Sequence, residues 1–186
     1  MTFAGTIGIL VVVALILLLA IPLGGYIYRV FTGQRNWLEP IYAPVERVIY
    51  KLVGINPAAE MDWKSYVKTW LLVQFIMAIF VYLIFVFQGV LPLNPDHIKG
   101  MSWDLAFNTA ASFITNTNWQ NYAGEQSMSY LGQMIAITYL QFTSAAAGVV
   151  AVIAFVRSIV ANKGKTLGNF WVDYVKVHTR ILLPLA

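Results

Sequence analysis

The sequence predicts an all-α membrane protein in which transmembrane helices flank a shorter, re-entrant helix. Of its 186 residues, 59% are hydrophobic and 11% are charged, whereas about 25% are charged in soluble domains. Three long runs contain no Asp, Glu, Lys or Arg, and most basic residues lie between them, as in membrane proteins. This composition argues against a soluble enzyme and a disordered chain. The absence of cysteine excludes disulfides and thiolate chemistry.

The first apolar run, residues 3–21, predicts an N-terminal transmembrane helix within residues 1–25. A helix of this length covers the hydrocarbon core of about 30 Å. A secretory signal peptide would place basic residues before the run and small residues at a cleavage site. No Lys or Arg precedes this run, and Pro22-Leu23-Gly24-Gly25 follows it. A retained helix is therefore favoured over a signal peptide.

The next stretch, residues 26–68, is predicted to be a basic cytoplasmic loop. It holds six Lys and Arg residues, and three prolines divide it into short pieces. Residues 45–53 fit an amphipathic helix on the membrane surface, or simply part of a solvated loop. The sequence favours neither of these two alternatives.

Two further uncharged runs, residues 69–91 and 131–156, predict the spans of a helix–loop–helix unit over residues 69–156. The second run is long enough to tilt or to extend beyond the bilayer. Its polar residues are candidates for bonds between helices or for lining a vestibule: Gln133, Gln141, Thr143 and Ser144. Residues 157–186 form a cytoplasmic segment and the start of another apolar run. That unfinished run indicates a piece of a longer sequence.

The distribution of Lys and Arg predicts the orientation of the chain. Six lie in residues 26–68 and five in residues 157–180, but only Lys99 lies between the second and third runs. We therefore expect a multi-pass protein of the cell membrane, plasma or inner, with an extracytoplasmic N-terminus. Residues 92–130 would lie on the outer side.

The segment between the second and third runs is unusually apolar for an extramembrane loop. Trp103, Ala106, Phe107 and Ala110 recur at helical spacing, which predicts a helix with one apolar face over about 103–114. Ser102 is a favourable N-cap residue. A helix of this length is too short to cross the bilayer, so we expect it to be re-entrant.

An uncharged polar run, residues 115–120, follows this short helix. A helix C-terminus that points into the membrane presents a partial negative charge and unpaired carbonyls. Uncharged oxygens suit a large monovalent cation. A divalent ion would favour carboxylates, and none lies between Asp104 and Glu125. The pattern fits a pore-loop cation channel, and a plain extracellular loop with a surface helix is the alternative.

Residues 108–120, Asn-Thr-Ala-Ala-Ser-Phe-Ile-Thr-Asn-Thr-Asn-Trp-Gln, resemble the first pore loop of the potassium-transporting ATPase A subunit family, KdpA. Residues 92–95, 102–106, 122–125, 144–148 and 166–173 resemble that family too. The resemblance covers the additional first helix and the first of four pore-loop repeats. It implies the helix–pore loop–helix unit of the superfamily of potassium transporters, with a pore helix at about 103–114 and a selectivity-filter loop at about 115–120.

The same resemblance implies that Thr115, Asn116, Thr117 and Asn118 form part of a potassium-binding filter. Gln120 would lie at the filter mouth. Glu125, just beyond it, would attract cations there, or is simply a solvated acid. No metal other than K⁺ is implied.

The implied function is the potassium-binding, pore-forming subunit of an ATP-driven, high-affinity potassium importer. It would bind K⁺ on the outer side and pass it toward an ATPase subunit. ATP would be used only by that KdpB-like partner, and KdpC-like and KdpF-like subunits would complete the complex. The chain would also contact membrane lipid, and we expect it to bind no nucleic acid. The sequence contains no phosphate-binding Gly-rich loop and no Asp-Lys-Thr-Gly motif, so we expect no enzyme activity from this chain by itself. A passive channel or symporter subunit of the same superfamily is the alternative, and a membrane-embedded enzyme is a more distant one.

Overall fold

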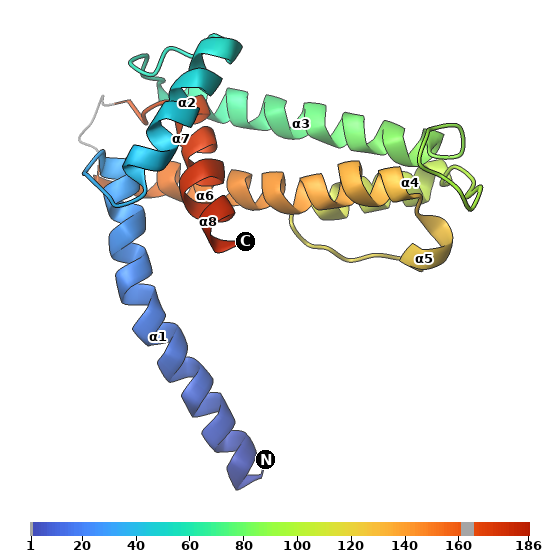
Figure 1. Cartoon of the computed structure of the whole chain (residues 1–186), viewed down its shortest axis with the longest axis horizontal. Helices are drawn as coiled ribbons and strands as arrows, with labels where there is room; N and C mark the ends of the chain where they lie inside the picture. The colour runs from blue at the N-terminus through green and yellow to red at the C-terminus, as the bar shows by residue number, and fades with distance from the viewer. Residues whose placement is uncertain (1, 161–165) are drawn as a thin grey trace.

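A computed structural model describes residues 2–160 and 166–186, and the described chain is almost entirely helical (Figure 1). The elements in order are α1 (Phe3–Thr32), α2 (Glu39–Val53), α3 (Trp63–Phe87), α4 (Trp103–Ile114), α5 (Gly124–Ser127), the π-helix η1 (Gly132–Thr138), α6 (Tyr139–Val160), α7 (Phe170–Lys176), the π-helix η2 (Val177–Leu182) and α8 (Leu183–Leu185). Lys163 and Lys165, which contribute to the second basic stretch, lie outside the described residues.

Within residues 2–160 and 166–186, three helices are long and apolar enough to cross a membrane: α1, α3 and the continuous helix η1–α6. Each covers all or most of one predicted apolar run, but the bounds differ: α3 ends at Phe87, four residues before the end of the predicted run 69–91. α1 continues beyond residue 25 to Thr32 and ends where Gly33 adopts a left-handed conformation, with φ of 72°. α3 begins before Thr69 because Asp62 caps it, accepting the N–H of Ser65 at 3.0 Å.

Residues 26–68 are not a simple loop, contrary to the sequence-based expectation. They contain the end of α1, all of α2 and the start of α3. Pro40 lies in the first turn of α2, where its missing N–H costs nothing, and Gly54 ends the helix in a left-handed conformation. Residues 45–53, which the sequence left open between a helix on the membrane surface and a loop, are helical and belong to α2.

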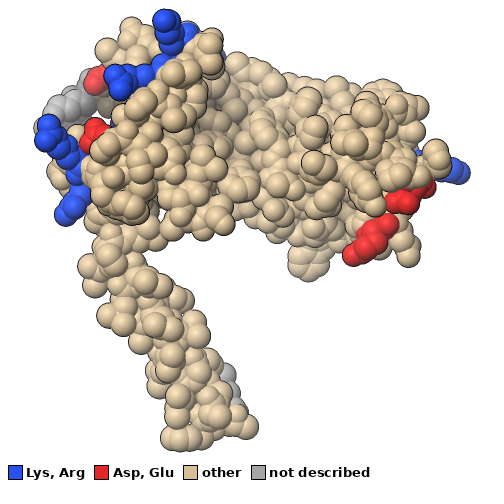
Figure 2. Space-filling view, viewed as in Figure 1, with Lys and Arg blue, Asp and Glu red and all other residues tan. Residues whose placement is uncertain are grey.

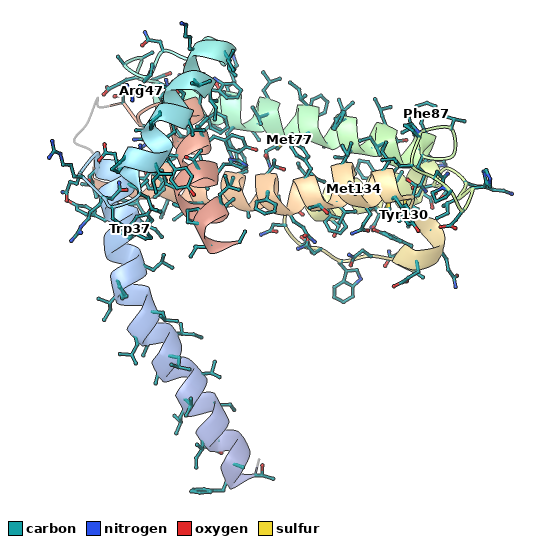
Figure 3. All side chains as sticks on the ribbon, in the orientation of Figure 1. Trp37, Arg47, Met77, Phe87, Tyr130 and Met134 are labelled. Atoms are coloured by element: carbon teal, nitrogen blue, oxygen red, sulfur yellow. The ribbon has the colours of Figure 1, made fainter. Side chains whose placement is uncertain are left out.

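α4 packs against α3 and α6, and this contact forms one of the two hydrophobic cores of the part of the chain that the structure describes. Met77 of α3 points into the space between the long helices (Figure 3), and Phe85, Ala106 and Phe113 of the same core are fully buried. α1, in contrast, diverges from the α3–α6 pair (Figure 1), and its most apolar window buries no residue. Lipid tails are as apolar as leucine side chains, so such a helix needs no protein neighbour in a bilayer.

A buried glutamine holds together the segments on either side of α4. Gln88, directly after α3, has no solvent exposure. Its amide nitrogen donates to the carbonyls of Lys99, at 3.0 Å, and Ser127, at 2.8 Å. Its amide oxygen accepts the N–H of Ser129 at 3.0 Å. The chain entering α4 and the chain returning from it are therefore fixed to one end of α3.

Candidate functional site

α4 is a short helix between α3 and α6, and the chain reverses its direction after it (Figure 1). It enters from the end of the α3–α6 pair that carries α5, stops partway along, and the chain then returns to the same end (Figure 1). The bounds Trp103–Ile114 agree with the periodicity of the sequence. Ser102 occupies the N-cap position with an extended backbone, but its side chain makes no capping hydrogen bond. Asp104 lies in the first turn, where a negative charge is favourable.

The chain turns back on the C-terminus of α4 directly after Ile114. The last four carbonyls of the helix all accept hydrogen bonds: Ala111 from Thr115, Ser112 from Thr117 and Asn118, Phe113 from Asn116, and Ile114 from Gln74. The expectation of unpaired carbonyls at the helix end is therefore wrong. The reason is that the turn and α3 bring donors to all of them. Free acceptors have to lie in the turn itself.

Ser112 is the centre of this turn. Its carbonyl accepts the N–H groups of Thr117, at 2.9 Å, and Asn118, at 3.3 Å. Its hydroxyl accepts the N–H of Trp119 at 2.7 Å. Successive backbone N–H groups thus converge on the end of the helix, as in the concave nests that alternating helical conformations form.

Asn116 and Asn118 supply the backbone conformations that this convergence requires. Their φ angles are 57° and 55°, in the left-handed region. Asparagine tolerates that region better than most residues because its short polar side chain bonds locally. The described chain has no cis peptide bond, so each carbonyl points opposite to the N–H of the following residue. With the N–H groups of residues 116–119 facing the helix end, the carbonyls of residues 115–118 face away from it.

These four carbonyls accept no hydrogen bond from any described residue. The side chains of the turn add further oxygens. The hydroxyls of Thr115 and Thr117 lie 2.9 Å apart, and the Ser144 hydroxyl lies 3.4 Å from the amide oxygen of Asn116. All four residues of the turn are exposed. The turn therefore presents a row of uncharged oxygen acceptors toward the outside of the described chain.

Two long helices support the turn from behind. Gln74 of α3 donates from its amide to the carbonyl of Ile114 at 3.3 Å, and Ser144 of α6 contacts Asn116. They line a cavity of about 690 Å³ together with Thr115 and Asn116. Ser144 was a candidate from the sequence. Gln74 was missed, although an amide within an otherwise apolar span was a usable signal.

The two residues proposed for the filter mouth lie farther along the returning chain. Gln120 follows Trp119, whose side chain is 72% exposed, and Glu125 lies in the first turn of α5. Both are exposed, and neither side chain forms a hydrogen bond with another described residue. Both therefore lie in the segment after the turn, and neither side chain is hydrogen-bonded to a residue of the turn.

Comparison with known proteins identifies the family. The model of the family KdpA, the potassium-transporting ATPase A subunit, matches residues 10–186. Proteins described as the potassium-binding subunit of potassium-transporting ATPase match the chain in Alicyclobacillus acidocaldarius and Brucella anthropi, at 59% and 49% identity over the whole chain and 33% of each relative. The Pseudomonas aeruginosa protein is 46% identical over 96% of the chain and 32% of its own length. The chain thus spans about a third of the length of these relatives, and it belongs to the KdpA family of potassium-transporting ATPase A subunits.

Proposed function

We propose that this chain supplies one side of a potassium site in an ATP-driven import complex of the cell membrane. The observation that carries the proposal is the row of outward-facing carbonyls at Thr115, Asn116, Thr117 and Asn118, which accept no bond from a described residue. Uncharged carbonyl oxygens replace the hydration shell of K⁺, and their number and arrangement determine the selectivity over Na⁺. The threonine hydroxyls add oxygens of the same kind.

A complete site needs oxygens from other directions, because one turn surrounds an ion on one side only. The relatives are about three times as long as this chain. We infer that residues 69–156 are the first of four helix–pore loop–helix repeats and that three further turns complete the site. The exposure of residues 115–118 supports this inference, since ligands to a shared ion have to remain accessible.

The orientation and the partners belong to the same proposal. On the face shown in Figure 2, Lys and Arg gather at the end of the molecule that carries α2, and that end would be cytoplasmic. The turn would then open toward the outer side, with an extracytoplasmic N-terminus. A KdpB-like P-type subunit would hydrolyse ATP, with KdpC-like and KdpF-like subunits in the same complex. Gln120 and Glu125 would lie on the path by which K⁺ enters.

The test compares two substitutions that each change the charge by one negative unit. In the assembled complex, Asn118→Asp places a carboxylate beside the carbonyl row, and we expect about a tenfold change in the ratio of apparent affinities for K⁺ and Na⁺, or about 1.4 kcal/mol. Lys99→Gln makes the same charge change in the loop before α4 and should leave the ratio unchanged. The measurement is ATPase activity against ion concentration. A normal Asn118→Asp variant together with an altered Lys99→Gln variant would place the site elsewhere, and ion flux without ATP would indicate a passive channel.

A further inference from the structure

An exposed apolar stripe runs along α2, on the side away from the rest of the protein. Ile41, Val45, Val48 and Leu52 are 62%, 48%, 57% and 80% exposed. Their spacing of four, three and four residues places them on one face of the helix. We call these four residues the α2 stripe. A row of large apolar side chains is unfavourable in water, so something apolar has to cover it.

The rotation of α2 about its axis is fixed by a buried ion pair. Glu46 accepts hydrogen bonds from the guanidinium of Arg180, at 2.6 Å to each carboxylate oxygen, and from the Thr179 hydroxyl at 2.8 Å. The side chains of Glu46 and Arg180 are only 4% and 7% exposed. α2 therefore cannot turn its stripe toward the protein without breaking this pair and exposing Tyr50, which lies on the same buried face.

Two basic residues flank the α2 stripe. Arg47 and Lys51 are one helical turn apart, and both are exposed. Arg47 projects outward from α2 in Figure 3, and Lys and Arg side chains gather at this end of the molecule in Figure 2. A helix with an apolar face and a basic flank is complementary to a lipid surface of negative charge.

The place of α2 in the fold fits such a surface. α2 runs across the end of α3 and α6 at which α3 begins and α6 finishes (Figure 1). Its 15 residues extend over about 22 Å, too short to cross a bilayer. Trp37 just before α2 and Trp63 in the first turn of α3 are 77% and 61% exposed, and tryptophan is enriched at the level of lipid headgroups.

We propose that α2 lies in the lipid–water interface of the leaflet at the basic end of the bundle. The α2 stripe contacts the acyl chains, and Arg47 and Lys51 bind the headgroups of anionic phospholipids. The ion pair between Glu46 and Arg180 holds α2 to α7–η2, so this contact anchors the basic end of the bundle to the membrane surface. The proposal is independent of the potassium site.

The first experiment identifies what covers the α2 stripe. These 186 residues contain no cysteine, so Val48→Cys adds one attachment site for a nitroxide to them, and any cysteine elsewhere in the complex is replaced first. Gln34→Cys, in the loop before α2, is the control. In the assembled complex in lipid nanodiscs, collisions with oxygen should dominate at position 48, and collisions with a water-soluble nickel chelate should dominate at position 34. Nickel collisions dominating at position 48 would show that water covers the stripe. Protection from both reagents would show that protein covers it. Either result overturns the proposal.

The second experiment tests the choice of anionic lipid. A fluorophore on the Val48→Cys variant is quenched by spin-labelled phosphatidylglycerol or phosphatidylcholine, and the ratio reports the preference for negative headgroups. Replacing Arg47 and Lys51 by Gln should lower that preference by about fivefold for each charge, while the α2 stripe stays intact. Lys99→Gln, which removes one charge at the opposite end of the bundle, is the control for a charge change away from the α2 stripe. An equal preference in the double variant and the control would overturn the role of the two basic residues.

Discussion

At the basic end of the bundle, two carboxylates, Glu46 and Asp173, are buried in ion pairs with arginines, whereas in the turn after α4 the polar side chains carry no charge and are exposed. Arg180 donates two hydrogen bonds to Glu46, one to each carboxylate oxygen. Arg157 bonds Asp173, which also accepts the hydroxyl of Tyr66 at 2.9 Å. In the turn, the backbone N–H groups are bonded inward and the carbonyls remain available.

The difference follows from the cost of removing a charge from water. A buried charge has to be paired and hydrogen-bonded to be tolerated, so Glu46 and Asp173 are each paired with an arginine, and these two pairs hold helices together. Carbonyl dipoles cost less to present without a partner, and they exchange easily with the water around a cation. The ion pairs at the basic end therefore connect helices, whereas the carbonyls of the turn after α4 have no partner among the described residues.

The largest expected effect comes from breaking a pair at the basic end. Glu46→Ala leaves the buried Arg180 guanidinium without its partner and should lower the stability by about 3–5 kcal/mol. Thermal unfolding of the assembled complex measures the loss. Glu39→Ala, on the same helix, removes a carboxylate that makes no hydrogen bond through its side chain to another described residue, and it should change the stability by less than about 0.5 kcal/mol. Equal losses in the two variants would contradict the role given to the pair.

A smaller effect is expected from removing the support behind the turn. Gln74→Leu deprives the Ile114 carbonyl of its side-chain donor, at a cost of about 1–3 kcal/mol. It should reduce discrimination between K⁺ and Na⁺ by roughly tenfold. Ion-dependent ATPase activity of the assembled complex gives this ratio.

A second variant separates support of the turn from direct attraction of the ion. Gln74→Glu keeps the size of the side chain but replaces the donor by an acceptor, so it should lose discrimination as Gln74→Leu does. If Gln74 acted on the ion directly, the added charge would instead raise the apparent affinity for K⁺. Gln141→Leu makes the same change on an exposed face of α6 and serves as the control.

The smallest effect concerns the left-handed backbone of the turn. Asn118→Val places a β-branched residue at a φ of 55°, which costs about 1–2 kcal/mol and should disturb the carbonyl row. Asn118→Gly accepts that conformation without strain and should keep the ratio of K⁺ to Na⁺ affinities near that of the unaltered protein. The same ion titrations compare the two variants. If valine and glycine behaved alike, backbone conformation at this position would not matter for selectivity.

The sequence alone determined those features that depend on neighbouring residues. The three spans and α4 follow from uninterrupted apolar runs and from helical periodicity, and both signals are local. The uncharged polar run after the short helix could be predicted too, because it is also a local feature of the sequence. Family resemblance then added the expectation that residues 115–118 form part of a potassium filter, with Gln120 and Glu125 at its mouth.

Only the tertiary structure decided the features that depend on distant residues. The sequence did not decide whether residues 45–53 form a helix or a loop, because the partner that Glu46 of α2 needs in order to be buried is Arg180, 134 positions away. The free acceptors were expected at the end of α4, yet the end is satisfied by Gln74, 40 positions before Ile114, and by a chain that folds back on Ser112. Local pattern shows where polar groups occur, but which of them remain available depends on the partners that the fold brings to them.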